Sequence, residues 1–451
     1  MPASAAPTIA IIGGGLSGLA LAIFVARLLP DATIKIYEVR PADQPSSWGT
    51  INMTPNALRV LDRLGVYKTI APQGYNFDNL TMLNHNLDLF ASVPIANVAE
   101  FGYQSLRIER RLIHAALLKE ARSKPQIEIL YDRKCTGITD SPSSSTVSIT
   151  FSSGETVTAD LLIACDGIHS TVRKSFVSDP AAREAHFMNQ LSIGGFITAA
   201  EIAEYSPKNV TYPIMMFAPE SQTGANFMLW PYTHDGQNLT FFTTLPKETE
   251  EADWKAAYDD KQKLKDILME TFSAPDSPWN TLVKRTIELS DASKYRHWAF
   301  YKHTLPEKFY SDSGRVIIIG DAAHAMPPSG GQGGAMAFED AETLAYTLAY
   351  TLRDSNGSSR LGSATALENL QKWSDHRLQR LRTIAELNAR MTSLRKAGNG
   401  FVGGVLFAVK MWVIWIMSWL GVLGRTRRAV NNYDAKKEAE VLFGEAITKM
   451  E

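Results

Sequence analysis

The N-terminal segment constrains the fold more than any other part of the sequence. The run TIAII, which begins at Thr8, is rich in β-branched residues and leads into GGGLSG, where Gly13, Gly15 and Gly18 have the spacing G-x-G-x-x-G. An apolar stretch of helical length follows, and the next short run, TIKIYE, ends at Glu38, 20 residues after Gly18. A strand, a glycine turn, a helix and a second strand with an acidic end are the fingerprint of a dinucleotide-binding βαβ unit.

Each part of this fingerprint has a physical task. Glycine lets the backbone approach a pyrophosphate closely. The helix N-terminus offers unpaired N–H groups and the positive end of its dipole, and Glu38 would accept hydrogen bonds from ribose hydroxyls. The alternative is a tight turn that binds nothing. Arg40 would suit a 2′-phosphate, but its place beside Glu38 favours a solvated loop charge.

The composition limits the class of protein. With 451 residues, 45% of them hydrophobic, and a formal net charge of −1, the chain is long enough for two or three globular domains, and nothing points to nucleic-acid binding. Cys135 and Cys165 provide neither a disulfide framework nor metal-ligand spacing, so we expect no metal and a reducing compartment. The opening MPASAAP carries no positive charge, so we expect a cytoplasmic protein rather than a secreted one.

Other strands are visible in the pattern of apolar residues. The runs ADLLIACDG and GRVIIIGDAA are apolar on both faces, which predicts a sheet covered on both sides. Thr54 followed by Pro55 predicts the start of a helix. From about residue 179 to 286 the pattern changes. Alternating runs flank HDGQ, a hairpin signal, and a charged helix is predicted from about Glu250 to Phe272.

Three further motifs identify a family. They are LLIACDGIHSTVRKSF (161–176), RVIIIGDAAHAMPPSGGQGGAMAFEDAETLA (315–345) and ERRLIHAALL (109–118). Together with the N-terminal fingerprint they closely resemble the single-component (group A) FAD-dependent aromatic hydroxylases, the family of p-hydroxybenzoate and salicylate hydroxylases. Fungal members look most similar, because the sequence around Tyr433 and Asp434 is also typical of them.

The resemblance implies an α/β fold, in which a Rossmann-like FAD-binding domain contains an inserted antiparallel-sheet substrate domain and is followed by C-terminal helices. We expect the FAD-binding domain in two parts. The first is 1–178, with an excursion into the substrate domain near 76–104, and the second is 287–370, which carries the GDAAH motif. The substrate domain would span 179–286. The C-terminal helices would span 371–451 and include a hydrophobic segment at 401–423.

The resemblance also implies roles for residues in the later motifs. Asp321 would accept hydrogen bonds from the ribityl hydroxyls of FAD. Gly333 and Gly334 precede a helix expected to begin near Ala335, and their N–H groups would face the pyrimidine edge of the flavin. His324 is interpreted as a structural histidine rather than a base.

Four more positions follow from the same comparison. Arg110 would contact the phosphate or ribityl region of FAD, with a surface cation at a helix start as the alternative. Asp166 would serve both FAD and the nicotinamide cofactor, or else cap a strand. Gly49 and Thr50 would line the flavin, although the family usually has G-x-G-I where this chain has WGTI.

The implied reaction uses NAD(P)H to reduce FAD, and O2 then gives a flavin C4a-hydroperoxide that transfers one oxygen atom. The stretch NQLSIGGF (189–196) lacks the arginine that many phenol-activating relatives carry, and the sequence indicates no catalytic acid or base. The apolar residues Phe217, Phe227, Met228 and Trp230 favour a bulky, hydrophobic, aromatic or polycyclic substrate, which would be hydroxylated or epoxidised. A role in fungal secondary metabolism would fit.

Other functions remain open at this point. One is a different flavoenzyme on the same scaffold, an oxidase or a halogenase, although the halogenase stretch W-x-W-x-I-P is absent. Another is a non-catalytic binding protein that keeps the fold. The sequence does not indicate the oligomeric state, or whether NADH or NADPH is preferred.

The apolar C-terminal segment allows two interpretations. Its GNGFVGG repeats the glycine spacing but follows no strand, so it is not a second nucleotide site. The run from Phe401 to Leu423 is long enough to span a bilayer but contains Lys410 and several glycines. Association with a membrane and packing on the enzyme as a buried helix are both left open.

Overall fold

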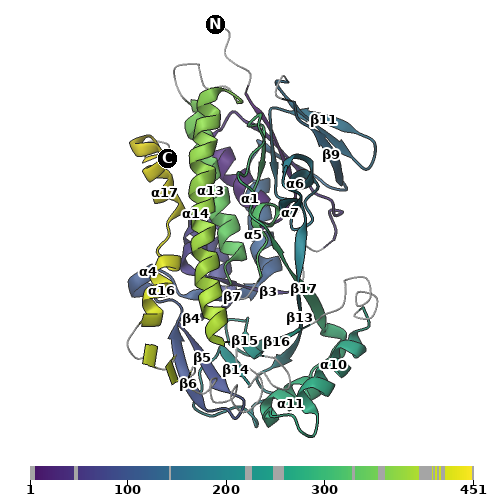
Figure 1. Cartoon of the computed structure of the whole chain (residues 1–451), viewed down its shortest axis with the longest axis vertical. Coiled ribbons are helices and arrows are strands. Elements are labelled where there is room, and N and C mark those ends of the chain that lie inside the picture. Colours follow the sequence, from purple (N-terminus) through teal and green to yellow (C-terminus); the bar gives the residue numbers. More distant parts are fainter. Residues whose placement is uncertain are drawn as a thin grey trace.

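The computed structural model describes residues 6–44, 49–141, 144–218, 226–246, 259–327, 331–353, 361–395 and 422–448, together with 409, 412–413 and 416–417. The molecule is elongated, with an α/β part at one end and a larger sheet at the other (Figure 1). Helices α13 (Gly333–Arg353) and α14 (Ala364–Arg395) run along its length.

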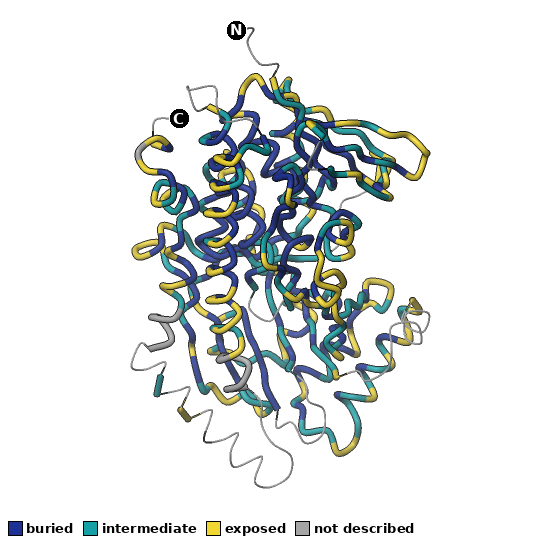
Figure 2. Tube along the Cα trace, turned by 45° about the horizontal axis from the view of Figure 1, so that its top comes forward, coloured by how far each residue is buried: buried dark blue, intermediate teal, exposed yellow. Residues whose placement is uncertain are grey.

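The α/β part is built on a sheet of five parallel strands in the order β18-β12-β1-β2-β8. Their bounds are β1 Thr8–Ile12, β2 Thr33–Tyr37, β8 Ile127–Leu130, β12 Leu161–Ala164 and β18 Val316–Ile318. Helix α1 (Leu16–Leu28) is almost wholly buried, as its apolar sequence requires. The central strands are likewise buried along their length, and Figure 2 shows this buried interior continuing through the α/β part.

A second sheet of seven strands has the order β17-β13-β16-β15-β14-β5-β6. Its strands are β5 Asn79–Asn84, β6 Leu89–Pro94, β13 Ala185–Thr198, β14 Ile214–Phe217, β15 Asn226–Pro231, β16 Asn238–Pro246 and β17 Arg296–His303. The predicted hairpin is confirmed, since β15 and β16 pair antiparallel around Gly236, whose φ is +70°. One face packs on helices α10 (Lys261–Ser273) and α11 (Thr281–Leu289) through a buried apolar cluster.

Two smaller sheets complete the strands. One, in the order β3-β7-β4, contains β3 Thr50–Met53, β4 Tyr75–Phe77 and β7 Ser105–Glu109. The other, in the order β11-β10-β9, contains β9 Cys135–Thr139, β10 Val147–Phe151 and β11 Thr156–Ala159 and lies at the far edge of the α/β part (Figure 1). The remaining longer helices are α2 Pro55–Arg63, α5 Arg110–Arg122, α6 Thr171–Phe176, α16 Val422–Asn431 and α17 Ala435–Phe443.

The fold class predicted from the sequence is confirmed: a parallel Rossmann-like sheet, antiparallel sheets and C-terminal helices. Two boundaries differ. Helix α13 begins at Gly333, two residues before the expected start, so both predicted flavin-facing glycines belong to its first turn. The charged helix of the second sheet begins at Lys261, and most of the earlier part of its predicted range lies outside the described residues.

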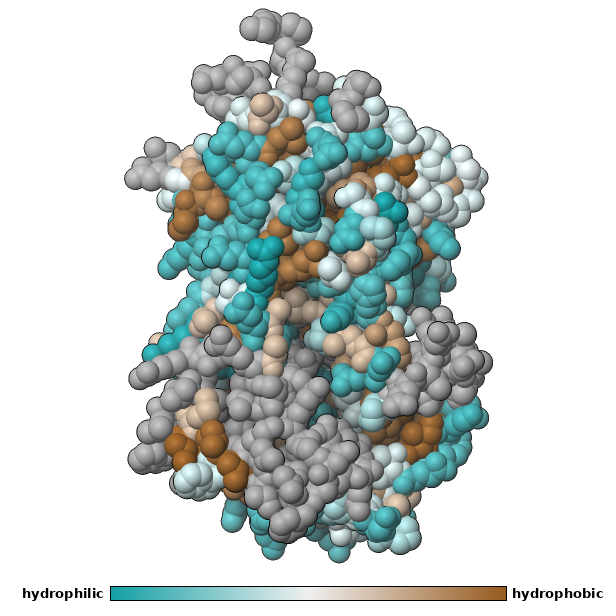
Figure 3. Space-filling view, viewed as in Figure 1, coloured by the Kyte–Doolittle hydropathy of each residue, from teal (hydrophilic) through white to brown (hydrophobic). Residues whose placement is uncertain are grey.

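The hydrophobic segment 401–423 lies largely outside the described residues. Of its described side chains, Met417 packs against an apolar cluster formed by β4, β5, β6 and β14, whereas Trp412 is 63% exposed. On the face shown in Figure 3, hydrophobic side chains gather in small groups among hydrophilic ones, one of them at the lower left. Within the part of the chain that is described, none of the helices has the length and apolar character that a membrane span needs.

Candidate functional site

The glycine turn after β1 is shaped by close backbone packing. Gly13 has φ +104°, and a Cβ atom there would lie 2.4 Å from the carbonyl oxygen of Cys165 on the neighbouring chain segment. A Cβ at Gly18 would lie 2.0 Å from the carbonyl oxygen of Gly13. Gly15 differs, because no described atom comes within 4 Å of its Cβ position, and it caps α1 without a side-chain hydrogen bond. The first N–H groups of α1 therefore remain available for an anionic ligand.

Glu38 lies beside this turn at the end of β2. Its Oε2 accepts a hydrogen bond from the Gly14 N–H (2.7 Å), and its Oε1 accepts from the backbone and Nε of Arg40 (3.0 and 2.8 Å). Burial alone would raise the pKa of Glu38, but the Arg40 hydrogen bonds bring it below its usual value. Arg40 is thus an ion-pair partner of Glu38 rather than a solvated loop charge. His114 on α5, which the sequence did not single out, contacts the carbonyl oxygen of Gly14 through Nε2 (2.8 Å).

Asp166 follows β12 and uses its two carboxylate oxygens differently. Its Oδ2 accepts hydrogen bonds from the N–H groups of Thr171 (2.9 Å) and Val172 (3.4 Å), which fixes the start of α6. Its Oδ1 is buried and has no hydrogen-bond partner among the described residues. Burial raises the pKa of this carboxyl group. Asp166 therefore caps the start of α6 with one carboxylate oxygen, and its other oxygen stays without a partner in the described structure.

Asp321 begins the short helix α12 (Asp321–His324) after β18, and its side chain is exposed. The preceding Gly320 has φ +61°, and its N–H donates to Asp340 Oδ2 (2.9 Å), which holds the turn in place. Arg110 lies at the first position of α5, and its backbone N–H donates to the carbonyl oxygen of Gly49 (3.0 Å). Burial lowers the pKa of Arg110, and the nearby Asp321 carboxylate opposes this shift. Arg110, Asp321 and Gly49 therefore belong to one region of the molecule.

The parallel sheet explains why distant motifs meet. The turns that carry Gly13, Glu38, Asp166 and Asp321 follow β1, β2, β12 and β18, which are neighbours in one parallel sheet. The carboxyl ends of parallel strands lie at the same edge, where open α/β sheets bind their ligands. The predicted residues after these four strands are thus brought to one edge of the sheet.

The glycine loop that leads into α13 (331–334) packs against β3 through its last residue, which already belongs to the first turn of the helix. A Cβ at Gly334 would lie 3.0 Å from both Ile51 Cδ1 and Met53 Cε, whereas no described atom comes within 4 Å of the corresponding position at Gly333. Thr50, which we expected to line the flavin, has its Oγ1 3.5 Å from Thr240 Oγ1 of the seven-stranded sheet. Thr50 therefore lies where the α/β part and the seven-stranded sheet meet.

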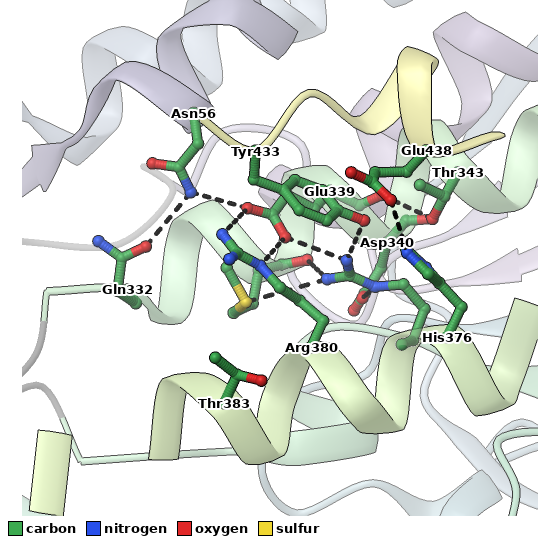
Figure 4. Close-up of polar contacts among 12 residues, drawn as sticks. Asn56, Gln332, Glu339, Asp340, Thr343, His376, Arg380, Thr383, Tyr433 and Glu438 are labelled. Carbon is green, nitrogen blue, oxygen red and sulfur yellow. Dashed lines mark hydrogen bonds and ion pairs between the residues drawn. The ribbon is translucent and has the colours of Figure 1, made fainter. Parts of the chain in front are cut away.

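A buried ion network joins helices α13 and α14 (Figure 4). Glu339 and Asp340 on α13 receive hydrogen bonds from Arg377 on α14 (3.0 and 2.8 Å), and Glu339 also pairs with Arg380 (3.0 Å). Arg377 additionally donates to the hydroxyl of Tyr433 (2.7 Å).

The network reaches the glycine loop through Asn56. This side chain donates to Glu339 (2.7 Å) and to Gln332 Oε1 (3.3 Å). At the other end, His324 Nε2 contacts Asp340 Oδ2 at 2.5 Å, as expected for a structural histidine. The C-terminal helices and both glycine turns are therefore parts of one polar network.

Arg173 of the DGIHSTVR motif is turned into the protein. It is fully buried and donates to four backbone carbonyl oxygens, those of Ala182, Thr304, Ala322 and Ala323 (2.5–3.0 Å). These contacts tie α6 to the end of α12. The position of Arg173 is that of a structural cation.

The seven-stranded sheet turns different residues to each face. Phe227 packs with Phe241 and Phe272 on the face covered by α10 and α11. The expectation that Phe227 lines the substrate site is therefore wrong, because its side chain points away from the α/β part. Met228 and Trp230 point to the opposite face, since side chains alternate along a strand. Arg107 of β7 lies 5.2 Å from the centre of the Trp230 ring. No sequence signal singled out Arg107, because it occupies an ordinary position in the alternation of a strand.

Comparison with known proteins identifies the family of this chain. A family described as FAD binding domain matches residues 6–371. A 6-hydroxynicotinate 3-monooxygenase of Pseudomonas fluorescens is 25% identical over 383 residues, which cover 82% of this chain and 92% of that protein. An FAD-dependent monooxygenase of Hypocrea jecorina is 29% identical over 412 residues, covering 87% and 86%.

Solved structures share the fold over nearly the whole chain. Klebsiella pneumoniae HpxO in complex with FAD and uric acid has a TM-score of 0.75 at 18% identity, covering 94% of this chain and 96% of that one. A salicylate hydroxylase substrate complex has a TM-score of 0.71 at 20% identity, covering 98% of each chain. At these identities the likeness establishes the fold.

Proposed function

The chain belongs to the FAD binding domain family, and from that premise we propose that it is an FAD-dependent monooxygenase that hydroxylates or epoxidises a hydrophobic aromatic or polycyclic molecule. NAD(P)H would donate the electrons, and O2 would donate the oxygen atom. The single observation that supports this most strongly is the convergence of four motif turns at one edge of the parallel sheet.

The residues at this edge fit FAD. Gly15 offers an uncapped helix start to the pyrophosphate, and Glu38 and the free Oδ1 of Asp166 offer acceptors to hydroxyl groups. Asp321 is exposed, so it is free to accept from the ribityl chain. Arg110 makes no hydrogen bond through its guanidinium in the described part of the chain and would balance the phosphate charge.

FAD, when bound, supplies the redox and oxygen-transfer chemistry. The protein contributes position and electrostatics. The N–H groups of Gly333 and Gly334, in the first turn of α13, would stabilise negative charge on the pyrimidine edge through the positive end of the helix dipole. We assign no side chain as catalytic acid or base.

One experiment separates this function from its alternatives. Purified protein is titrated with FAD, and NAD(P)H oxidation is then followed with a panel of aromatic substrates under ¹⁸O₂. We expect a flavin spectrum, substrate-stimulated oxidation and product that carries one ¹⁸O atom. Oxidised product without ¹⁸O would identify an oxidase, halide-dependent product would identify a halogenase, and protein that takes up no flavin would leave a binding function.

We also propose the domain boundaries at residues 178, 286 and 370, a cytoplasmic location, an association with membranes through residues 401–423 and a role in fungal secondary metabolism. Sedimentation of cell extracts with and without detergent tests the membrane association directly, since a protein wholly in the soluble fraction would exclude it.

A further inference from the structure

Arg107 lies between the two sheets that meet beside the proposed flavin site. It is in β7, the central strand of the small sheet, directly opposite Asn52 of β3 and Tyr75 of β4. Residues directly opposite in antiparallel strands share one face of the sheet. The guanidinium reaches the seven-stranded sheet, where it is 5.2 Å from the ring centre of Trp230 and 5.5 Å from that of Phe242.

Among the described residues, this arginine has no counter-ion. It is only 9% exposed, and within that part of the chain its side chain makes one hydrogen bond, a long one, from Nη2 to Thr240 Oγ1 (3.5 Å). Its Nε has no partner, and no carboxylate among the described residues forms an ion pair with it. Burial lowers the pKa of Arg107 to about 9. An unpaired buried charge is costly, and proteins retain one mainly where a ligand will meet it.

The other buried arginines show the contrast. Arg377 and Arg380 pair with the carboxylates of Glu339 and Asp340, and Arg173 donates to four carbonyl oxygens. The guanidinium groups of these three arginines are thus paired or hydrogen-bonded. Arg107 lacks such partners, although it is almost equally buried.

Other polar atoms near Arg107 also lack partners within the described structure. They are Asn52 Oδ1, the indole Nε1 of Trp230 and Ser105 Oγ. Ser105 lies on the same face of β7 as Arg107. Asn52 also lies beside the loop before α13, because a Cβ atom added at Gly331 would lie 3.9 Å from Asn52 Nδ2. The unpaired groups therefore extend from the loop before α13 to Arg107, on the side of the molecule where a substrate would meet the flavin.

We propose that Arg107 is the specificity-determining residue of the substrate site, and that it binds an anionic oxygen, a carboxylate or an ionised phenol, on a planar aromatic substrate. This inference rests on the proposed monooxygenase function and adds the charge of the substrate to it. A guanidinium presents a planar fork of donors that matches such an oxygen group. Trp230 and Phe242 hold the guanidinium by cation–π contacts and offer apolar surface to the ring.

The test uses FAD-loaded enzyme and matched pairs of probes with one, two and three fused rings: benzoate and benzamide, 2-naphthoate and 2-naphthamide, 2-anthroate and its amide. Affinity is measured by calorimetry and by the change in flavin absorbance. We expect at least one acid to bind at least 10-fold more tightly than its amide. Arg107→Gln should weaken the binding of that acid by about 10- to 150-fold, the usual effect of losing a charged hydrogen-bond partner, and leave the amide unchanged.

Two further variants sharpen the result. Arg107→Lys keeps a point charge without the planar fork, so its acid affinity should fall between those of the wild type and Arg107→Gln. Arg111→Gln is the matched control, because Arg111 is 58% exposed and paired with Glu109 on the surface. It should bind every probe like the wild type. The comparison of acids with amides in the wild-type protein needs no variant, so misfolding of a variant does not remove the test.

Three results would overturn the proposal: equal affinity for acids and amides, no measurable binding of any acid, or an acid preference that survives in Arg107→Gln. Loss of FAD from Arg107→Gln with unchanged probe selectivity would show that Arg107 serves the flavin instead. Failure of oxygen insertion with an Arg107-dependent acid preference would refute the proposed function and leave this inference standing.

Discussion

Replacing Arg377 by Met tests whether the buried ion network holds the site together. Arg377→Met keeps a long unbranched side chain but removes the hydrogen bonds to Glu339 Oε2 (3.0 Å), Asp340 Oδ1 (2.8 Å) and the Tyr433 hydroxyl (2.7 Å). Both carboxylates stay buried. Glu339 keeps Arg380 and Asn56, whereas Asp340 keeps, among the described residues, only His324 and the Gly320 N–H.

The expected cost follows from this loss. Removing one partner of a buried ion pair destabilises a protein by about 3–5 kcal/mol. An unfolding entropy of about 2.1 cal/mol/K per residue gives about 1 kcal/mol/K for a chain of 451 residues that unfolds as one unit. The melting temperature of Arg377→Met should therefore fall by about 3–5 °C, measured by calorimetry or circular dichroism.

The effect should also depend on pH. Burial alone would raise the pKa of Asp340, but His324, Arg377 and the Gly320 N–H hold it at about 2. An unfolded aspartate has a pKa of about 3.9. The stability that this depressed pKa confers is fully present above about pH 4 and is lost as the pH falls toward 2. Because Arg377 contributes to the depression, the difference between wild type and variant should shrink over the same window.

The control is Lys372→Met, on the same helix α14, where Lys372 pairs with Glu368 at the surface. It should leave the melting temperature unchanged, since exposed pairs contribute little. If Arg377→Met were no less stable than Lys372→Met, or if its deficit were the same at pH 3 and pH 7, the network would not have the role that we assign to it.

Three further predictions concern the nucleotide turn and its partners. Gly18→Ala should lower both the melting temperature and the FAD content, because a Cβ atom there would lie 2.0 Å from the Gly13 carbonyl oxygen. Gly15→Ala should fold normally and should only bind FAD more weakly. Equal melting temperatures for the two variants would contradict this packing argument. Asp321→Ala should leave the stability of the apo-protein unchanged, because the side chain is exposed. It should weaken FAD binding by about 1.5–3 kcal/mol in a fluorescence titration. An unaltered FAD affinity would show that Asp321 does not belong to the site. Glu38→Gln keeps the shape of the side chain but loses the charge that pairs with Arg40, so FAD affinity should fall, and a rise would indicate that Arg40 prefers a free phosphate.

The motif turns could be predicted because each depends on local backbone chemistry. At Gly13, Gly18 and Gly320, the strand that precedes the turn, the glycine and the helix that follows are adjacent in sequence. Their meeting at one edge also follows from the sequence, since strands joined by helical crossovers are parallel and end on the same side. The family resemblance then supplied the identity of the ligand.

The ion network could not be predicted in the same way. Residues 367–396 appear in the sequence as a polar helix, and polar helices usually face solvent. Arg377 is fully buried only because α13 supplies Glu339 and Asp340 and the segment before α17 supplies Tyr433. Which face of α14 is covered depends on elements far away along the chain.

The sequence by itself determined the Rossmann-like unit and its nucleotide turn, because these depend on spacing within about 40 residues. The resemblance of the later motifs to a known family then implied FAD as the cofactor. Only the tertiary structure decided that Phe227 turns away from the proposed site, that Arg40 pairs with Glu38, and that Arg107 is buried against Trp230, 123 residues later in the chain. The burial of Arg107 without a counter-ion among the described residues arises from the long-range packing of the two sheets. The residue pattern along a single strand does not indicate which element will cover that strand.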